Sequence, residues 1–256
     1  YKVTDAHTDW SSYDGTLGSS LGTSYFLADM LPWPLQSMDR VVGVRGWARD
    51  VSRLCLMAQR NRMYRAEAHA ALSPDGTKVA YTVNENNADA ATLYVMDVGS
   101  GEVSDVDVIE GAKWAYPSWE PDNEGFYYTH FPTDDSIPED ERTGQADVRY
   151  HELGTPESED RIVHGPTGNP RTTQGIEVSR DGDWLIRTVS FGWNRTDVFV
   201  RRRDDTDGEW KTLVEGKPNN YRVRVWNDTF YVVTDDGAPR SRLMKIEAGS
   251  WDRSEW

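Results

Sequence analysis

The chain has 256 residues and a formal net charge of -15, from 28 Lys and Arg against 43 Asp and Glu. This length is enough to bury the core of one large domain or of a domain with an appendage. Because nucleic acids and anionic membranes bind concentrated Lys and Arg, the acidic balance excludes both as expected partners. A single cysteine, Cys55, excludes an internal disulfide framework and a Cys-based zinc site, and we expect no cofactor.

Residues 1–70 form an N-terminal segment to which the sequence assigns no fold. Its first part is polar and rich in Gly and Ser, and residues 40–65 then carry seven arginines against one acid, Asp50. Apolar residues at helical spacing, such as Val51, Leu54 and Ala58, favour an amphipathic helix over about residues 50–70. A solvated helix face is preferred to a basic partner-binding helix. We expect this segment to pack less well than the remainder.

A recurring turn organises residues 71–256. In the Ser-Pro-Asp-Gly turn at residues 73–76, Pro74 presets the backbone, Asp75 bonds it locally and Gly76 accepts a positive φ. Similar turns return at residues 120–125 and 179–182, and a weaker one at 227–228. Each precedes a strand-like run, at intervals of about 40 to 50 residues, the length of a four-stranded propeller blade. The pattern predicts an all-β fold, a partial β-propeller of three to four blades.

We place the strands in four sets, each new set beginning after one of these turns. The sets are residues 79–83, 93–98, 106–109 and 114–119; residues 126–129, 147–153, 161–163 and 176–179; residues 184–190, 197–202, 211–214 and 221–226; and residues 230–233 and 241–246. Trp119, Trp184 and Trp226 are assigned to the core between blades. The acidic insertion at residues 133–143 lacks the ligand pattern of a calcium loop, so a solvated, mobile loop is expected.

Two patterns resemble a catalytic motif or a metal site, but the surrounding sequence does not support either function. Residues 18–22 fit the G-x-S-x-G nucleophile motif with Ser20 at its centre, but no strand precedes them and no helix follows. A flexible loop is therefore expected, and no catalytic residue. The histidines show no ligand spacing, so no metal is implied, and His151 is expected to pack or hydrogen-bond within a strand.

Further motifs follow one another in a family-specific order. They are Asp-Val-Gly-Ser-Gly-Glu at residues 97–102, Glu-Gly-Ala-Lys-Trp at 110–114, Gly-Phe-Tyr-Tyr at 125–128, Tyr-His-Glu-Leu-Gly-Thr-Pro-Glu-Ser-Glu-Asp at 150–160 and Ala-Pro-Arg-Ser-Arg-Leu at 238–243. With the turn at residues 73–76, this order resembles the N-terminal propeller of the prolyl oligopeptidase family of serine peptidases. The resemblance covers about residues 72–256. Residues 1–70 do not align with the family pattern.

The resemblance implies a seven-bladed propeller that caps an α/β-hydrolase domain and admits only short peptides to its Ser-Asp-His triad. Trp114 follows Lys113 where the family carries an aromatic residue that reaches toward the peptide pocket, although core packing of Trp114 is an equal alternative. Two further pocket positions of the family, occupied there by Met and Cys, correspond to Thr173 and Trp193. A family arginine is replaced near Ser190.

The expected function is therefore that of a substrate-gating, non-catalytic propeller portion of a prolyl-oligopeptidase-like endopeptidase acting on short proline-containing peptides. Its partner would be the hydrolase domain, which this chain lacks, so the chain alone is expected to be inactive. The alternative is a self-standing propeller-type binding or scaffold protein. An open ring is expected to expose Trp184, Val189, Phe230 and Val232, and so to cause self-association or marginal stability. The compartment, cytoplasm or periplasm, stays open.

Overall fold

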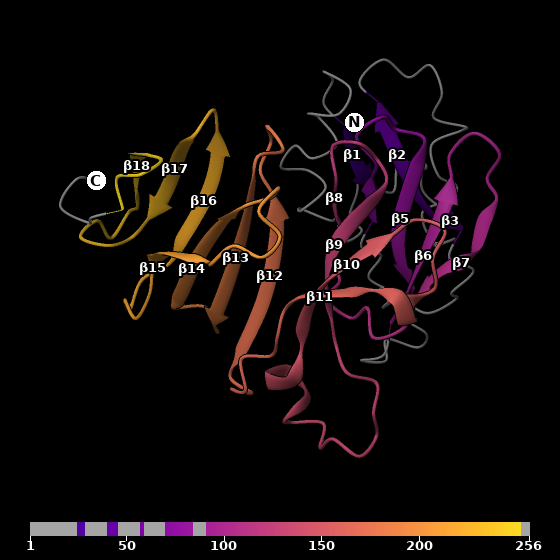
Figure 1. Ribbon diagram of the computed structural model, residues 1–256, viewed down its shortest axis with the longest axis horizontal. Coiled ribbons are helices and arrows are strands. Elements are labelled where there is room, and N and C mark those ends of the chain that lie inside the picture. The colour runs from indigo at the N-terminus through magenta and orange to yellow at the C-terminus, as the bar shows by residue number, and fades with distance from the viewer. Residues whose placement is uncertain (1–24, 29–39, 46–56, 59–69, 84–90, 252–256) are drawn as a thin grey trace. The chain divides into compact units, whose positions relative to one another are not determined.

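The computed structural model describes residues 25–28, 40–45, 57–58, 70–83 and 91–251 (Figure 1). The chain divides into two compact units, Tyr1–Thr133 with Arg149–Ile162, and Asp134–Val148 with Val163–Trp256. Apart from two short 3-10 helices, the regular structure of the described residues consists of antiparallel strands. Within the described part of the chain no helix is long and apolar enough to cross a membrane. The predicted all-β class is confirmed.

The first strands lie in the segment to which the sequence assigns no fold. Strands β1 (Tyr25–Ala28), β2 (Arg40–Arg45) and β3 (Met57–Ala58) form a three-stranded sheet in that order. Residues 57–58 are thus strand where the sequence favours a helix, and most of the expected helix lies outside the described residues. Residues 18–22, with Ser20, lie outside them as well. The predicted boundary at residue 70 stays a prediction.

Four further sheets follow in chain order, and in each the strands are hydrogen-bonded consecutively. The first sheet contains β4 (Ala70–Leu72), β5 (Lys78–Val83), β6 (Thr92–Asp97) and β7 (Val103–Ile109). The second contains β8 (Ser118–Trp119), β9 (Gly125–His130), β10 (Asp147–Glu152) and β11 (Arg161–His164). The third contains β12 (Thr172–Val178), β13 (Trp184–Phe191), β14 (Arg195–Arg202) and β15 (Lys211–Val214). The fourth contains β16 (Tyr221–Trp226), β17 (Thr229–Thr234) and β18 (Arg242–Glu247).

The recurring turn joins the first two strands of each sheet. Leu72 pairs with Val79 across the first turn, and Val178 pairs with Leu185 across the third. The predicted grouping is therefore wrong, because each set starts one strand too late. A tight turn with a positive φ, such as 77° at Gly76, folds the strands on either side of it into a hairpin, so both belong to the same sheet. The strand before each turn belongs to the sheet that follows it.

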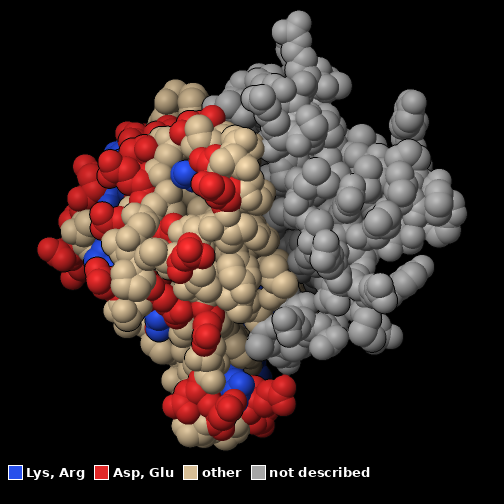
Figure 2. All heavy atoms as spheres, turned by 90° about the vertical axis from the view of Figure 1, so that its right-hand side faces the viewer, with Lys and Arg blue, Asp and Glu red and all other residues tan. Residues whose placement is uncertain are grey.

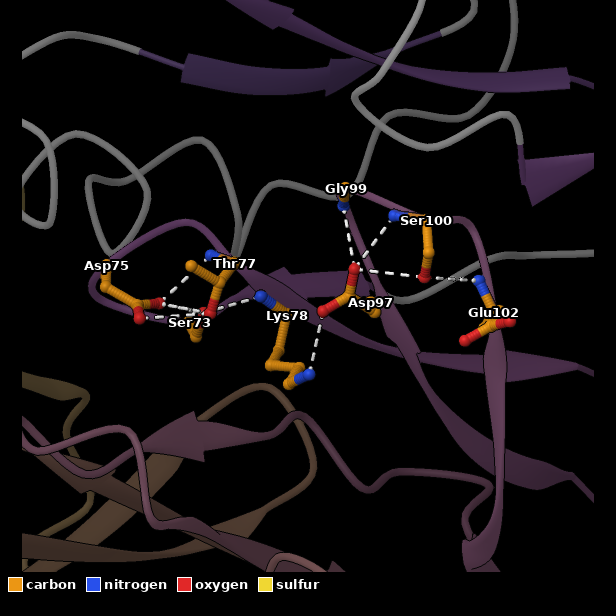
Figure 3. A network of polar contacts seen from close by, with 8 residues as sticks. All are labelled: Ser73, Asp75, Thr77, Lys78, Asp97, Gly99, Ser100 and Glu102. Carbon is orange, nitrogen blue, oxygen red and sulfur yellow. Dashed lines mark hydrogen bonds and ion pairs between the residues drawn. The ribbon is translucent and has the colours of Figure 1, made fainter.

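Side chains fix one end of the first sheet, where its first and third hairpin turns lie, as the close-up shows (Figure 3). Asp75 Oδ1 accepts hydrogen bonds from the Ser73 hydroxyl at 2.7 Å and from the Thr77 N–H at 3.0 Å. Asp97 accepts from the backbone N–H groups of the next turn and, at 2.8 Å, from Lys78 Nζ. The hydrogen bond from Lys78 is the main reason that the pKa of Asp97 lies well below its usual value. The two hairpin turns are thereby linked through side chains.

The core of each unit is apolar and aromatic. In the first unit, Trp119, Phe126 and Tyr128 are buried, and the Trp119 indole donates a hydrogen bond to the Ala71 carbonyl at 3.0 Å. In the second unit, Trp184 packs edge-on against Phe230 with ring centroids 5.0 Å apart. The predicted core positions of Trp119 and Trp184 are therefore confirmed.

Two sequence-based expectations about burial and one about secondary structure are corrected. Trp226 is 46 % exposed and lies beneath the Arg180 guanidinium, so its assignment to the core is wrong. Conversely, the four residues expected to be exposed by an open ring are all buried: Trp184, Val189, Phe230 and Val232. On β17 one row of alternating side chains is buried and includes Phe230 and Val232, whereas β13 buries residues of both its faces, Trp184 on one and Val189 on the other. Residues 114–117, expected to be strand, instead form the end of a turn and an irregular stretch before β8.

The acidic insertion has the predicted irregular, largely exposed character over residues 133–141. It leads into the 3-10 helix η4 (Arg142–Gln145), whose Gly144 lies so close to Asn169 and Pro170 that a Cβ there would come within 2.7 Å of the Pro170 nitrogen. The insertion is therefore tied to its unit at its C-terminal end. Figure 2 shows Asp and Glu side chains spread over the visible face of the described residues, as the net charge predicts.

Candidate functional site

Trp114 lies in a half-buried aromatic and cationic cluster at the start of the second sheet. Its ring packs edge-on against Phe131, with centroids 5.3 Å apart. Lys113 Nζ lies 4.8 Å from the centroid of the Trp114 ring and 5.6 Å from that of Phe131. Because an ammonium group over an aromatic face is attracted by the ring quadrupole, Lys113 and Trp114 stabilise each other's orientation. The half-buried Trp114 ring is thus packed against Phe131 with a positive charge over it.

The loop that carries this cluster is fastened to strand β9 at both ends. The Phe131 N–H donates to the Gly111 carbonyl at 2.7 Å, and the Thr129 N–H donates to the Ala115 carbonyl at 3.2 Å. Gly111 has a φ of 65°, and a Cβ built there would lie 2.0 Å from the Phe131 carbonyl oxygen. Only glycine fits this close backbone approach. The position of Trp114 is therefore set by backbone contacts as well as by its own packing.

Charged groups surround the same loop. Glu157, in the 3-10 helix η5 (Glu157–Glu159), accepts the Glu110 N–H at 2.9 Å and lies 3.4 Å from His130 Nε2 and 3.7 Å from an Arg149 nitrogen. Burial raises the pKa of Glu157, but the hydrogen bonds from His130 and from the Glu110 N–H outweigh it and lower the pKa. Glu157 therefore stays ionised at neutral pH and anchors the Glu110 end of the loop.

The other two predicted pocket residues, Thr173 and Trp193, belong to the second unit, whereas Trp114 belongs to the first. Thr173 is exposed on β12 and pairs with Ser190 on β13, three residues before Trp193. Trp193 is 94 % exposed in the turn between β13 and β14, and its carbonyl accepts a hydrogen bond from the Asn220 side chain at 2.9 Å. The structure thus brings Thr173 and Trp193 to the same end of one sheet.

Sequence reasoning overlooked a buried arginine in this sheet. Arg187 is 5 % exposed, donates from Nε to Gln174 Oε1 at 2.8 Å and lies 4.9 Å from the Phe199 ring centroid. Burial lowers its pKa to about 10, so it remains a cation at neutral pH. The one available signal was an Arg inside the apolar run of residues 184–189, where a charge needs a specific partner.

The described residues contain no candidate metal site. In that part of the chain, no group of three or more His, Cys, Asp or Glu side chains could hold a metal ion. His151 is fully buried and bonded to Asp107 and Asp160, as expected for a strand histidine that packs and hydrogen-bonds.

Comparison with known proteins identifies the family. Residues 57–256 match the family model described as "Prolyl oligopeptidase, N-terminal beta-propeller domain". This chain belongs to that family. The predicted partial β-propeller and the resemblance on which it partly rested are both confirmed, and the domain is by its description one part of a peptidase.

Curated relatives and a solved structure support the assignment. The chain is 28 % identical over 191 residues to the dual function macrocyclase-peptidase POPB of Amanita bisporigera, covering 68 % of this chain and 26 % of the relative. It is 28 % identical over 196 residues to a prolyl endopeptidase of Elizabethkingia meningoseptica, covering 74 % and 27 %. A structure from a study of two prolyl endopeptidases matches with a TM-score of 0.75 at 33 % identity, over 95 % of this chain and 38 % of that one.

A more distant structure shows the fold alone. Prolyl oligopeptidase B from Galerina marginata, bound to a 25mer macrocyclization substrate, matches with a TM-score of 0.69 at 20 % identity, over 89 % of this chain and 35 % of that one. The chain thus spans about a quarter of the length of the curated prolyl oligopeptidase relatives and about a third of the solved ones.

Proposed function

We propose that this chain is the substrate-gating, non-catalytic propeller portion of a prolyl-oligopeptidase-like serine endopeptidase that acts on short proline-containing peptides. The observation that supports the proposal most strongly is the match of residues 57–256 to the family's N-terminal propeller domain. A relative named prolyl endopeptidase matches over 196 residues, 74 % of this chain. The partner is then an α/β-hydrolase domain that carries the serine nucleophile, and the propeller restricts which peptides reach it.

Trp114 would supply the propeller's contact with the peptide. A half-buried indole held from one side by Phe131 offers a rigid apolar surface, which loses little conformational entropy when a proline ring packs on it. Lys113 Nζ would lie beside the bound segment and favour a carbonyl or carboxylate oxygen there. Thr173 and Trp193 are proposed to line the pocket as well.

The test begins with the DNA on either side of the coding sequence. A frame that adjoins this chain and encodes a Ser-Asp-His hydrolase domain is expected, and the longer protein should then be produced whole. It should cleave a short Gly-Pro peptide but leave the same sequence uncut inside a folded protein. Absence of a hydrolase frame would instead favour the alternative, a self-standing propeller that acts as a binding or scaffold protein.

The same longer protein tests the role of Trp114. We expect Trp114→Ala to lower kcat/KM on the short peptide about 10- to 100-fold, the range expected for an aromatic contact worth roughly 1–3 kcal/mol. Trp226→Ala is the matched control, because Trp226 is also partly exposed but lies at the end of β16, in the last sheet of the described residues. Equal effects of the two substitutions would refute a specific role for Trp114.

A further inference from the structure

His151 sits at the centre of a buried ionic cluster in the first unit. Its side chain, on β10, has no exposed surface. Nδ1 lies 2.8 Å from Asp160 Oδ1, and Nε2 lies 3.0 Å from Asp107 Oδ1. An ionised carboxylate only accepts hydrogen bonds, so both ring nitrogens must donate for both contacts to form. The geometry therefore calls for an imidazolium cation between two carboxylates.

Each of the two carboxylates accepts a further hydrogen bond. The Gly154 N–H donates to Asp107 Oδ1 at 2.6 Å, and the Tyr128 hydroxyl donates to Asp160 Oδ2 at 2.6 Å. Burial raises the pKa of Tyr128, so its hydroxyl keeps its proton and remains a donor. Because every one of these contacts is a donor directed at a carboxylate oxygen, the hydrogen-bond geometry favours the ring with both nitrogens protonated over the neutral one.

The cluster connects two neighbouring sheets. Asp107 lies on β7, the last strand of the first sheet, whereas His151 lies on β10 of the second sheet. Asp160 follows η5 and directly precedes β11. The imidazolium ring therefore bridges β7 of one sheet to β10 and the residue before β11 of the next, at a point from which water is excluded.

We propose that protonated His151 is a cationic clamp between the sheets β4–β7 and β8–β11, and that loss of its proton at alkaline pH loosens them. With a neutral ring, one carboxylate loses its donor while staying buried, and an unpaired buried charge is costly. The clamp would thus make this part of the propeller sensitive to alkaline pH.

The pH range follows from the groups that face the ring. These are Asp107 from β7, Asp160 beside β11 and, through Asp160, Tyr128 from β9, with Arg149 and Glu157 as the next charges around Tyr128. Burial by itself lowers the pKa of His151, but the hydrogen bonds to Asp107 and Asp160 outweigh it and raise the pKa to about 9. Because the folded pKa exceeds that of the unfolded chain, the stabilisation is complete below about pH 6.5 and falls until about pH 9. From pH values well below 6.5 to values well above 9, the clamp's contribution to the folding equilibrium constant should fall about 300-fold in total.

The first test is the protonation state of His151 in the unaltered chain, which avoids any variant that fails to fold. Two-bond proton–nitrogen correlation spectra of 15N-histidine-labelled protein should show one buried ring with both nitrogens protonated at pH 7.5 and titrating near pH 9. Replacing the other histidines one at a time with Gln assigns its signal. A ring that is neutral at pH 7.5 would overturn the proposal.

The second test removes one half of the clamp while keeping its shape. Asp107→Asn should lower the pH at which His151 loses its proton by about one unit or more. It should also reduce the fall in urea-measured stability between pH 6.5 and pH 9.5. Asp105→Asn, on the same strand but exposed, is the matched control and should change neither quantity. Unchanged titration and stability profiles in Asp107→Asn would contradict the clamp.

Discussion

Asp181 accepts a hydrogen bond from the backbone N–H of Asn227 at 2.6 Å, although 46 residues separate them in the chain. Asp181 lies in the first hairpin turn of the third sheet, and Asn227 lies in the first hairpin turn of the fourth. The first unit contains a related contact, in which Asn123 Oδ1 accepts the Asp75 N–H at 2.9 Å. Within each unit the recurring turn therefore ties two sheets together, the first to the second and the third to the fourth, as well as closing its own hairpin.

This contact predicts a stability effect. Asp181→Ala removes the acceptor of the Asn227 N–H and of the Ser179 hydroxyl, so it should lower the free energy of unfolding by about 1–3 kcal/mol. Asp183→Ala, two residues away and exposed, should change it by less than about 0.5 kcal/mol. Urea unfolding of the full chain measures both. Equal losses would mean that the turn's contact with Asn227 contributes nothing.

The same turns show how far the sequence predicts the fold. The turns can be identified from the sequence, because the hydrogen bond of Asp75 and the positive φ of Gly76 both depend on residues close together in the chain. The assignment of strands to sheets is wrong by one strand. The sequence of a turn does not show whether the turn lies within a sheet or between two sheets. Strand alternation likewise indicates two faces without saying which one is covered, and this is why Trp226 was misplaced.

The candidate site was only partly predictable for a similar reason. Trp114 was found through the family order of motifs, but its partner Phe131 lies 17 positions further along the chain and carries no signal of that contact. His151 was expected to hydrogen-bond, yet its partner Asp107 is separated from it by 44 residues. Such pairs depend on how sheets meet, and a single sequence does not give that.

The loop that positions Trp114 can be disturbed without touching Trp114. Gly111→Ala places a Cβ within 2.0 Å of the Phe131 carbonyl oxygen, so the loop must move away from β9. We expect a loss of about 1–3 kcal/mol in unfolding free energy and a change in tryptophan fluorescence. Gly101→Ala is the control, because Gly101 has a similar φ of 76° and no atom within 4 Å of the added Cβ.

A comparison of these two variants separates backbone strain from steric clash. If Gly101→Ala destabilised the chain as much as Gly111→Ala, the positive φ alone would account for the effect. The close contact between Gly111 and Phe131 would then not be what holds the loop.

The outer face of the last sheet predicts how the chain associates. Its exposed side chains include Trp226, Tyr231, Val233 and Leu243, and Val233 pairs directly with Leu243 across β17 and β18. The adjacent exposed apolar residues Val233 and Leu243 favour association, although charged neighbours on the same face and the net charge of -15 oppose it. We expect the sedimentation coefficient to rise with concentration, and Leu243→Asp to suppress that rise.

The control for association is Ile162→Asp, which changes an exposed apolar residue of the first unit. It should leave the concentration dependence unchanged. A chain that stays monomeric at every concentration would contradict the expectation that this face mediates self-association.

The central claim, that this chain is a non-catalytic propeller portion of a peptidase, is tested most directly by a cleavage assay. The purified chain, at micromolar concentration, is incubated with a chromogenic Gly-Pro peptide beside a Ser20→Ala variant. We predict no turnover above buffer for either protein, since Ser20 is the one serine in a nucleophile-like motif and its sequence context lacks the flanking strand and helix. Turnover by the unaltered chain that disappears in Ser20→Ala would contradict the account.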